Sequence, residues 1–115
     1  MKVIYHVDAM EAWAMALGNV RNMLDWLQYN QKDYEIEVLA NGPAVRGYLP
    51  GILSDSLYVI MAQAKAEGVV FAACHNAVRA QALDPKDLIE KTLVVPAGVI
   101  ELAQKQQAGF AYIKP

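Results

Sequence analysis

Apolar residues along this chain follow two alternating patterns. Short, largely apolar stretches, typical of strands, lie at 3–7, 34–40, 69–73, 92–95 and 110–113. Between them, apolar positions recur at helical spacing over 9–29, 55–67 and 98–107, and briefer helical segments are expected at 77–81 and 84–90. Strands that alternate with helices predict a mainly parallel five-stranded sheet covered on both faces, which is a three-layer α/β/α sandwich.

Polar residues mark where the predicted helices begin. Asp8, with Glu11 three residues later, has the pattern of a helix N-cap with its capping-box partner, so we expect a helix to start at Asp8. Ser54 or Asp55 is expected to cap the next long helix, which Gly68 ends.

The second strand and the connection after it depart from the simple pattern. Glu35 and Glu37 alternate with apolar residues, which predicts that one face of this strand is partly exposed to water near its start. The following residues, 41–51, are rich in glycine and proline and exceed the usual connection of about 2–6 residues. Long connections of this kind are often functional, and 44–48 is expected to form a short helical turn.

Composition limits the classes of protein to consider. The 115 residues predict a single domain, 1–115. Hydrophobic residues make up 56% of the chain and charged residues 19%, and we expect the apolar surplus to lie in an interface of a homo-oligomer. The formal net charge of −2 argues against nucleic acid as a partner, because nucleic acid requires a basic face.

Targeting signals and cysteine content suggest a compartment. No apolar run approaches the ~18 residues that span a bilayer, and the first residues lack the apolar stretch of a secretory signal. One cysteine cannot form an internal disulfide, and a reduced thiol is typical of the cytoplasm. We therefore expect a cytoplasmic protein without a membrane segment.

The only cysteine occupies the most informative position in the chain. The apolar run 69–73 leads directly into Cys74, His75 and Asn76, where a central strand passes into a helix. Ligands and chemistry gather at this edge of parallel sheets. A helix start favours the thiolate form of Cys74, and a protonated His75 or Arg79 would favour it further. The alternative is a structural cysteine, because unpaired cysteine is among the most buried residue types.

Other familiar sites are absent or unsupported. Asp8, residues 41–51 and Cys74 are expected at one edge of the sheet. The residue types of a metal site occur at His6, Asp8, Cys74 and His75, but no ligand spacing supports one. His6 is expected to be a histidine with its hydrogen bonds satisfied. No glycine-rich phosphate or dinucleotide motif and no C-x-x-C occurs, and Cys74 and Arg79 are separated by four residues rather than the five of tyrosine-phosphatase loops. We predict no cofactor.

Five segments, taken together, carry a family resemblance. They are N-V-R-N-M-L at 19–24, V-L-A-N-G-P-A-V at 38–45, A-C-H-N-A-V-R at 73–79, V-V-P-A-G-V-I-E-L at 94–102 and G-F-A-Y-I-K-P at 109–115. In this order and spacing the chain resembles the DsrE/DsrF-like family of small sulfur-handling proteins. The resemblance implies a flavodoxin-related α/β/α fold, assembly as trimers or hexamers, and a cysteine that accepts sulfane sulfur as a persulfide and passes it on. Cys74 matches the position of that cysteine.

The leading hypothesis is therefore a cytoplasmic sulfur carrier or sulfurtransferase that uses Cys74 as its nucleophile, with a protein as sulfur donor or acceptor. The candidate supporting residues are His75, Asn76, Arg79, Asn22, Asn41 and Gly42. One alternative is a non-catalytic oligomeric binding or assembly protein in which Cys74 is structural. Another is a small-ligand-binding module built on residues 41–51. Exposure of Cys74 would distinguish the sulfur-transfer hypothesis from a structural role.

Overall fold

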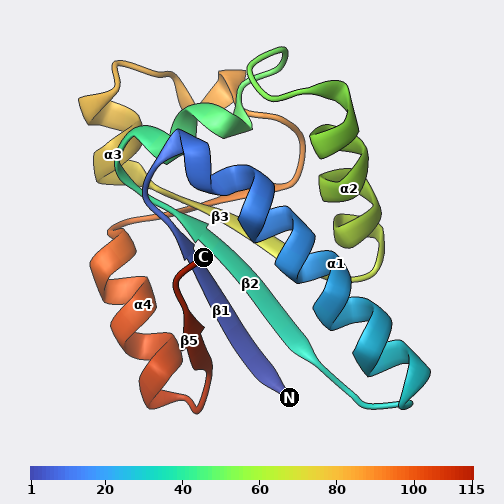
Figure 1. Cartoon of the computed structure of the whole chain (residues 1–115). Coiled ribbons are helices and arrows are strands. Elements are labelled where there is room, and N and C mark those ends of the chain that lie inside the picture. The colour runs from blue at the N-terminus through green and yellow to red at the C-terminus, as the bar shows by residue number, and fades with distance from the viewer.

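A single all-parallel sheet of five strands, in the order β4-β3-β2-β1-β5, forms the centre of the computed structural model, which describes residues 1–115 (Figure 1). The strands are β1 (Lys2–Val7), β2 (Glu35–Ala40), β3 (Val70–Cys74), β4 (Thr92–Val95) and β5 (Ala111–Ile113). The central strands are nearly continuous apolar runs because they are covered on both faces. All five lie where the apolar runs predicted them.

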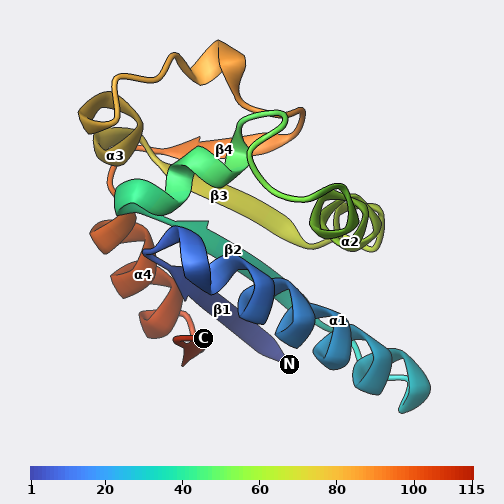
Figure 2. The same cartoon turned by 45° about the horizontal axis from the view of Figure 1, so that its top comes forward.

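Helices cover both faces of the sheet, as Figure 2 shows: α1 and α2 lie on one side and α4 on the other. The predicted three-layer α/β/α fold is confirmed. A bilayer-crossing segment needs about 20 mainly apolar residues, and no helix provides one. The α-helices are α1 (Trp13–Tyr29), α2 (Asp55–Ala66), α3 (His75–Ala80) and α4 (Gly98–Gln107), and the 3-10 helices are η1 (Met10–Ala12), η2 (Gly42–Tyr48) and η3 (Pro85–Asp87).

Trp13 and Tyr48 fix the long connection after β2 onto the sheet. Both side chains are fully buried and meet edge to face, with ring centroids 5.2 Å apart. The Trp13 indole donates to the carbonyl of Ala44 at 2.9 Å, and the Tyr48 hydroxyl donates to the carbonyl of Ala72 in β3 at 2.9 Å. Residues 42–48 therefore form an anchored 3-10 helix, somewhat longer than the predicted turn.

The predicted helix start at Asp8 is wrong. The backbone first forms η1, and α1 begins only at Trp13 without a side-chain cap. Asp8 instead accepts a hydrogen bond from the ammonium of Lys114 at 2.9 Å, because β5 brings the C-terminal segment next to the end of β1. The cap at Ser54 is confirmed, since its hydroxyl accepts from the amide of Leu57.

The expectation of a partly wet face on β2 holds for Glu35 and is wrong for Glu37. Glu35 is exposed, whereas Glu37 is only 3% exposed because α4 packs over this part of the sheet. Its Oε1 lies 4.0 Å from Nζ of Lys105, and its Oε2 has no hydrogen-bond partner. Burial, with repulsion from Glu101, raises the pKa of Glu37 to about 7, although the Lys105 ammonium acts in the opposite direction.

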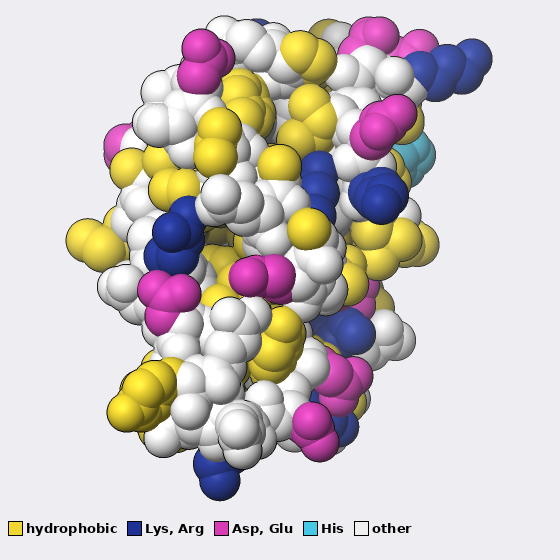
Figure 3. All heavy atoms as spheres, turned by 90° about the vertical axis from the view of Figure 1, so that its right-hand side faces the viewer, with side chains coloured by type: hydrophobic (Ala, Val, Ile, Leu, Met, Phe, Trp, Pro, Cys, Tyr) yellow, Lys and Arg dark blue, Asp and Glu magenta, His cyan; other side chains and the backbone are white.

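The apolar surplus appears on the surface of the single chain. Figure 3 views the side of the molecule that carries α2, where apolar side chains lie among lysines and carboxylates. A second group comprises Val70, Leu93, Val99 and Ile100, each more than two fifths exposed. Val70 and Leu93 belong to the sheet face that α4 covers only in part, since they share that face with Ala72, which packs in the core beneath α4.

Candidate functional site

The parallel register brings the ends of the three central strands level with one another. The residues that share this carboxyl edge are Asp8 after β1, Asn41 after β2 and Cys74 at the end of β3. Parallel strands open on the same edge, so these residues, far apart in the sequence, become neighbours in the fold. Their predicted common edge is confirmed.

Cys74 is the last residue of β3 and the N-cap of α3. Cys74 is only 6% exposed and is buried in the single chain, so the exposure that would favour the sulfur-transfer hypothesis is not observed there. The backbone of Gly98, at the start of α4, packs closely against it: a Cβ placed on Gly98 would lie 3.1 Å from the Cys74 Cβ and 3.3 Å from the Asn41 Cβ. The first turn of α4 therefore covers both Cys74 and Asn41.

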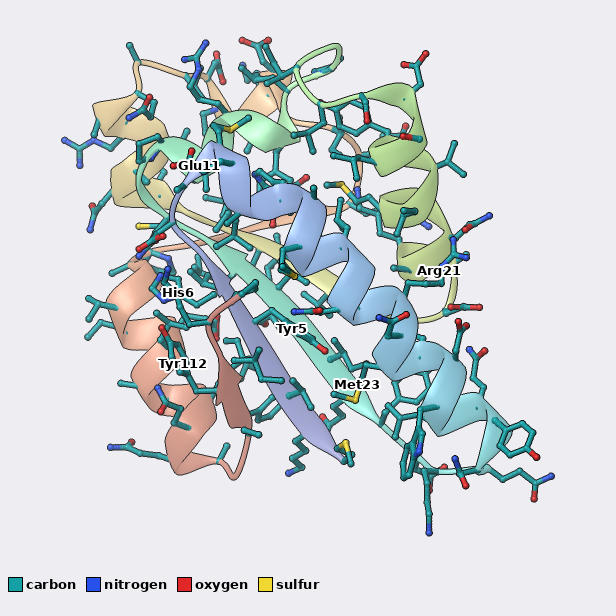
Figure 4. The ribbon with its side chains drawn as sticks, viewed as in Figure 1. Tyr5, His6, Glu11, Arg21, Met23 and Tyr112 are labelled. Carbon is teal, nitrogen blue, oxygen red and sulfur yellow. The ribbon has the colours of Figure 1, made fainter.

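A chain of hydrogen bonds reaches Asn41 from the edge strand β5. The Tyr112 hydroxyl lies 2.6 Å from Nδ1 of His6, and Nε2 of His6 lies 2.9 Å from Oδ1 of Asn41. Because Oδ1 only accepts, Nε2 carries the proton, and in a neutral ring Nδ1 then accepts from Tyr112. The Asn41 carboxamide is thereby oriented, and its N–H groups remain free to donate elsewhere. Figure 4 shows His6 and Tyr112 projecting toward one another.

Asp8 and Lys114 add an ion pair at the same edge. The Lys114 Nζ to Asp8 Oδ1 distance is 2.9 Å, and both side chains are substantially exposed. The hydrogen bond from Lys114 lowers the pKa of Asp8 below its ordinary value, and the same bond raises the pKa of Lys114. A pair this exposed contributes little stability, but it ties the C-terminal segment to the end of β1.

The supporting residues predicted from the sequence lie in three places. Gly42 lies at the edge with Asn41, where its φ of +54° suits glycine and a Cβ would meet the Asp8 carbonyl at 3.4 Å. His75, half-buried, starts α3, while Asn76 and Arg79 are exposed on the same helix. Asn22 lies apart from them on α1. It lines a cavity of about 230 Å³ that also includes Tyr5, Asn19, Met23 and Ile113.

Sequence reasoning did not single out Tyr112 and Lys114 as site residues. Each contacts a partner 106 positions earlier in the chain, and only the position of β5 beside β1 brings them together. The one available signal was the closing segment G-F-A-Y-I-K-P, which contains both residues. No three histidine, cysteine, aspartate or glutamate side chains gather closely enough to hold a metal ion.

Comparison with known protein families identifies the family of this chain. A model of the family described as the DsrE/DsrF-like family matches residues 8–115, nearly the whole chain. The chain belongs to the DsrE/DsrF-like family. The family match includes Asp8, Asn41, Cys74 and the closing segment, so the whole carboxyl edge described above lies within it.

Solved structures show the same DsrE/DsrF-like fold. MTH1491 from Methanobacterium thermoautotrophicum, described as a protein of unknown function, is 31% identical with a TM-score of 0.85, over 99% of this chain and 98% of that one. The ychN protein from E. coli is 14% identical with a TM-score of 0.77, over 100% of this chain and 99% of that one, a likeness of fold. No match was found among curated protein sequences.

Gly98 offers a way to perturb Cys74 in this DsrE/DsrF-like chain without touching its chemistry. Gly98→Ala would add a methyl group against Cys74, Leu39 and Asn41, and we expect it to cost about 1–3 kcal/mol of stability. We also expect slower alkylation of Cys74 in the folded protein, because the methyl group narrows access to the thiol. Val99→Ala, at an exposed position of the same turn, is the matched control. An unchanged alkylation rate in Gly98→Ala would contradict the packing of Gly98 over Cys74.

Proposed function

We propose that this protein is a sulfur carrier or sulfurtransferase that holds sulfane sulfur as a persulfide on Cys74. Membership of the DsrE/DsrF-like family supports a sulfur-relay role. The observation that carries the proposal is the position of the only cysteine: Cys74 ends β3 at the carboxyl edge and lies, with Asn41, against the first turn of α4. That is where an α/β sheet gathers its chemistry.

Two groups near Cys74 are candidates to bind an anionic sulfur: the first turn of α4 and the side chain of Asn41. α4 begins at Gly98 after Ala97, which provides no side-chain cap, so no side chain at that position competes for the first-turn amides. The positive end of the helix favours a nearby thiolate or persulfide anion. Asn41, oriented by His6 and Tyr112, has two free N–H donors that we assign to the same anion. His75, Asn76 and Arg79 of α3 are further candidates for stabilising it.

The proposed reaction is two successive exchanges at sulfur. The Cys74 thiolate attacks the terminal sulfur of a donor persulfide, R–S–SH; a new S–S bond forms at Cys74, the donor S–S bond breaks, and the donor thiolate leaves. An acceptor thiolate then attacks the terminal sulfur of the Cys74 persulfide, and the Cys74 thiolate leaves. No net oxidation occurs, because the sulfane sulfur passes from one thiol to another.

We further propose that the protein works in the cytoplasm as a homo-oligomer, a trimer or hexamer, with a protein as sulfur donor or acceptor. The exposed apolar side chains of Val70, Leu93, Val99 and Ile100 support association between copies, because a small protein rarely leaves such groups in water. They also lie on the same side as the first turn of α4, so association there would shape access to Cys74.

A structural cysteine is the second candidate, and the 6% exposure of Cys74 favours it. Cys74 belongs to the apolar core cluster and contributes to its packing. If packing is its only role, Cys74→Ser places a hydroxyl in an apolar site at a cost of about 1–3 kcal/mol, and the parent protein holds no sulfane sulfur.

Cys74→Ser separates the two candidates. Under the proposed function, the parent protein treated with inorganic polysulfide and desalted releases about one sulfane sulfur per chain to cyanide as thiocyanate. The serine variant releases none, although its melting temperature is expected to fall because the hydroxyl replaces a buried thiol. Loss of stability in the variant, together with no releasable sulfur in the parent, would establish the structural role instead.

A further inference from the structure

A groove runs between α2 and the segment before β4, and it is separate from the site around Cys74. The groove has a volume of about 810 Å³, and neither Cys74 nor Asn41 lines it. Its volume falls in the range of about 300–1,000 Å³ that is usual for small-molecule sites. Its walls come from α2 between Tyr58 and Ala66, from Pro50 and Gly51, and from residues 86–91. The side of the molecule on which α2 lies is the one shown in Figure 3.

The chemistry of the groove is mixed. Met61 is fully buried at its base, and Leu88 and Ile89 are half-buried in the opposite wall. Three lysines, Lys65, Lys86 and Lys91, line the same space. The three ion pairs of the molecule lie elsewhere, so none of these ammonium groups has a carboxylate within 4.0 Å.

Lys65 is the least solvated of the three lysines. Its side chain is half-buried, its Nζ donates to the carbonyl of Glu90 at 2.8 Å, and the Phe71 ring centroid is 5.8 Å away. An ammonium group has three donors, and this is the only hydrogen bond that it makes to the protein. Burial lowers the pKa of Lys65; the charge of Glu90 raises it, and that of Lys91 lowers it further.

We propose that this groove binds a small organic monoanion with an apolar body, such as a carboxylate on an alkyl or aryl group. The anionic head contacts the ammonium of Lys65, with Lys86 and Lys91 contributing to the local positive charge. The apolar body packs against the half-buried side chains of Leu88 and Ile89. An inorganic anion would leave the apolar walls unused, and a neutral apolar molecule would leave Lys65 without a counter-charge.

The acidic residues of the groove limit the charge of the ligand. Asp87 and Glu90 also line it, and both are exposed. Three lysines against two carboxylates leave a small positive excess, which suits a single negative charge and disfavours a polyanion. A nucleic acid or a polyphosphate would place further negative charges against the carboxylates of Asp87 and Glu90.

Octanoate is a suitable probe, and methyl resonances of Met61 and Ile89 report on the groove directly. In the full-length protein we expect saturable shifts of these methyls with octanoate and at least tenfold weaker binding of 1-octanol, which has a similar chain without the charge. Lys65→Met should weaken octanoate binding about tenfold or more, because a hydrogen bond to a charged group is worth about 1.5–3 kcal/mol. Lys65→Arg should preserve binding, and Lys32→Met, at an exposed lysine outside the groove, should leave it unchanged.

Three results would overturn the proposal. The first is the absence of saturable shifts with octanoate, or shifts confined to methyl groups outside the groove. The second is equal affinity for octanoate and 1-octanol, which would show that the lysine charge is not used. The third is undiminished octanoate binding by a folded Lys65→Met protein. Because Lys65→Arg keeps both the charge and the length, it separates a lost ligand contact from a general loss of folding.

Discussion

Gly47→Ala is expected to destabilise the protein by about 3 kcal/mol, near the upper end of the usual range for overpacking. A Cβ on Gly47 would overlap the indole of Trp13, lying 2.6 Å from its Cε2. Trp13 cannot yield easily, because it is fully buried and its indole donates to the Ala44 carbonyl within the same 3-10 helix. Either this hydrogen bond breaks or η2 moves away from the sheet.

Urea unfolding of the parent and variant proteins measures this effect as a change in the free energy of unfolding. Gly18→Ala is the matched control: Gly18 lies inside α1, nothing occupies the position of its Cβ within 4 Å, and alanine should stabilise that helix by about 0.5–1 kcal/mol. If Gly47→Ala changed the free energy of unfolding by less than about 0.5 kcal/mol, the contact between Gly47 and Trp13 would not be as close as described.

The buried carboxyl of Glu37 is expected to make stability fall as pH rises from about 4.5 to about 7. The pKa of Glu37 is raised from 4.5 to about 7 in the folded protein, so over this interval the folded chain binds more protons than the unfolded chain. The stability that the protonated Glu37 carboxyl provides is fully present below pH 4.5, and it is lost as the pH rises through the pKa of the folded protein. The total is on the order of 3 kcal/mol, because each pKa unit corresponds to about 1.4 kcal/mol.

Comparison of two glutamine variants isolates this effect. Glu37→Gln should lose most of the decline in unfolding free energy between pH 5 and about 7.5, because the amide does not ionise there. Glu35→Gln, two residues earlier on the same strand, should retain the decline, since Glu35 is exposed and pairs only loosely with Lys2 at 3.7 Å. An identical pH dependence in the parent and Glu37→Gln proteins would show that Glu37 is ionised in the folded state as readily as in water.

Local sequence patterns predicted the elements of this fold better than they predicted the contacts between them. Strands and helices follow from apolar periodicity, which each segment carries by itself. The predicted helix cap at Asp8 was wrong, because the Asp8 carboxylate accepts a hydrogen bond from Lys114 instead of capping a helix. The prediction that Glu37 is exposed was wrong, because the alternation along β2 does not reveal that α4 covers that face of the sheet.

The candidate site shows the same division. Cys74 and Asn41 could be placed at one edge from the sequence, because strands of a parallel sheet end together. Their burial beneath α4 could not be predicted, because it depends on the approach of Gly98, which lies 24 residues after Cys74 in the chain. The link from Tyr112 through His6 to Asn41 depends on β5 pairing with β1, and strand order is not carried by any one segment.

Intact-mass spectrometry after treatment with a persulfide donor tests the central claim most directly. The folded protein should gain the mass of one sulfur atom, located after alkylation on the peptide that contains Cys74 and removed by a reducing thiol. The same treatment in urea is the control, because it exposes the thiol and shows that the donor is active. Sulfur loading in both conditions is the predicted result; loading of the unfolded chain alone would contradict a sulfur-carrying role for Cys74.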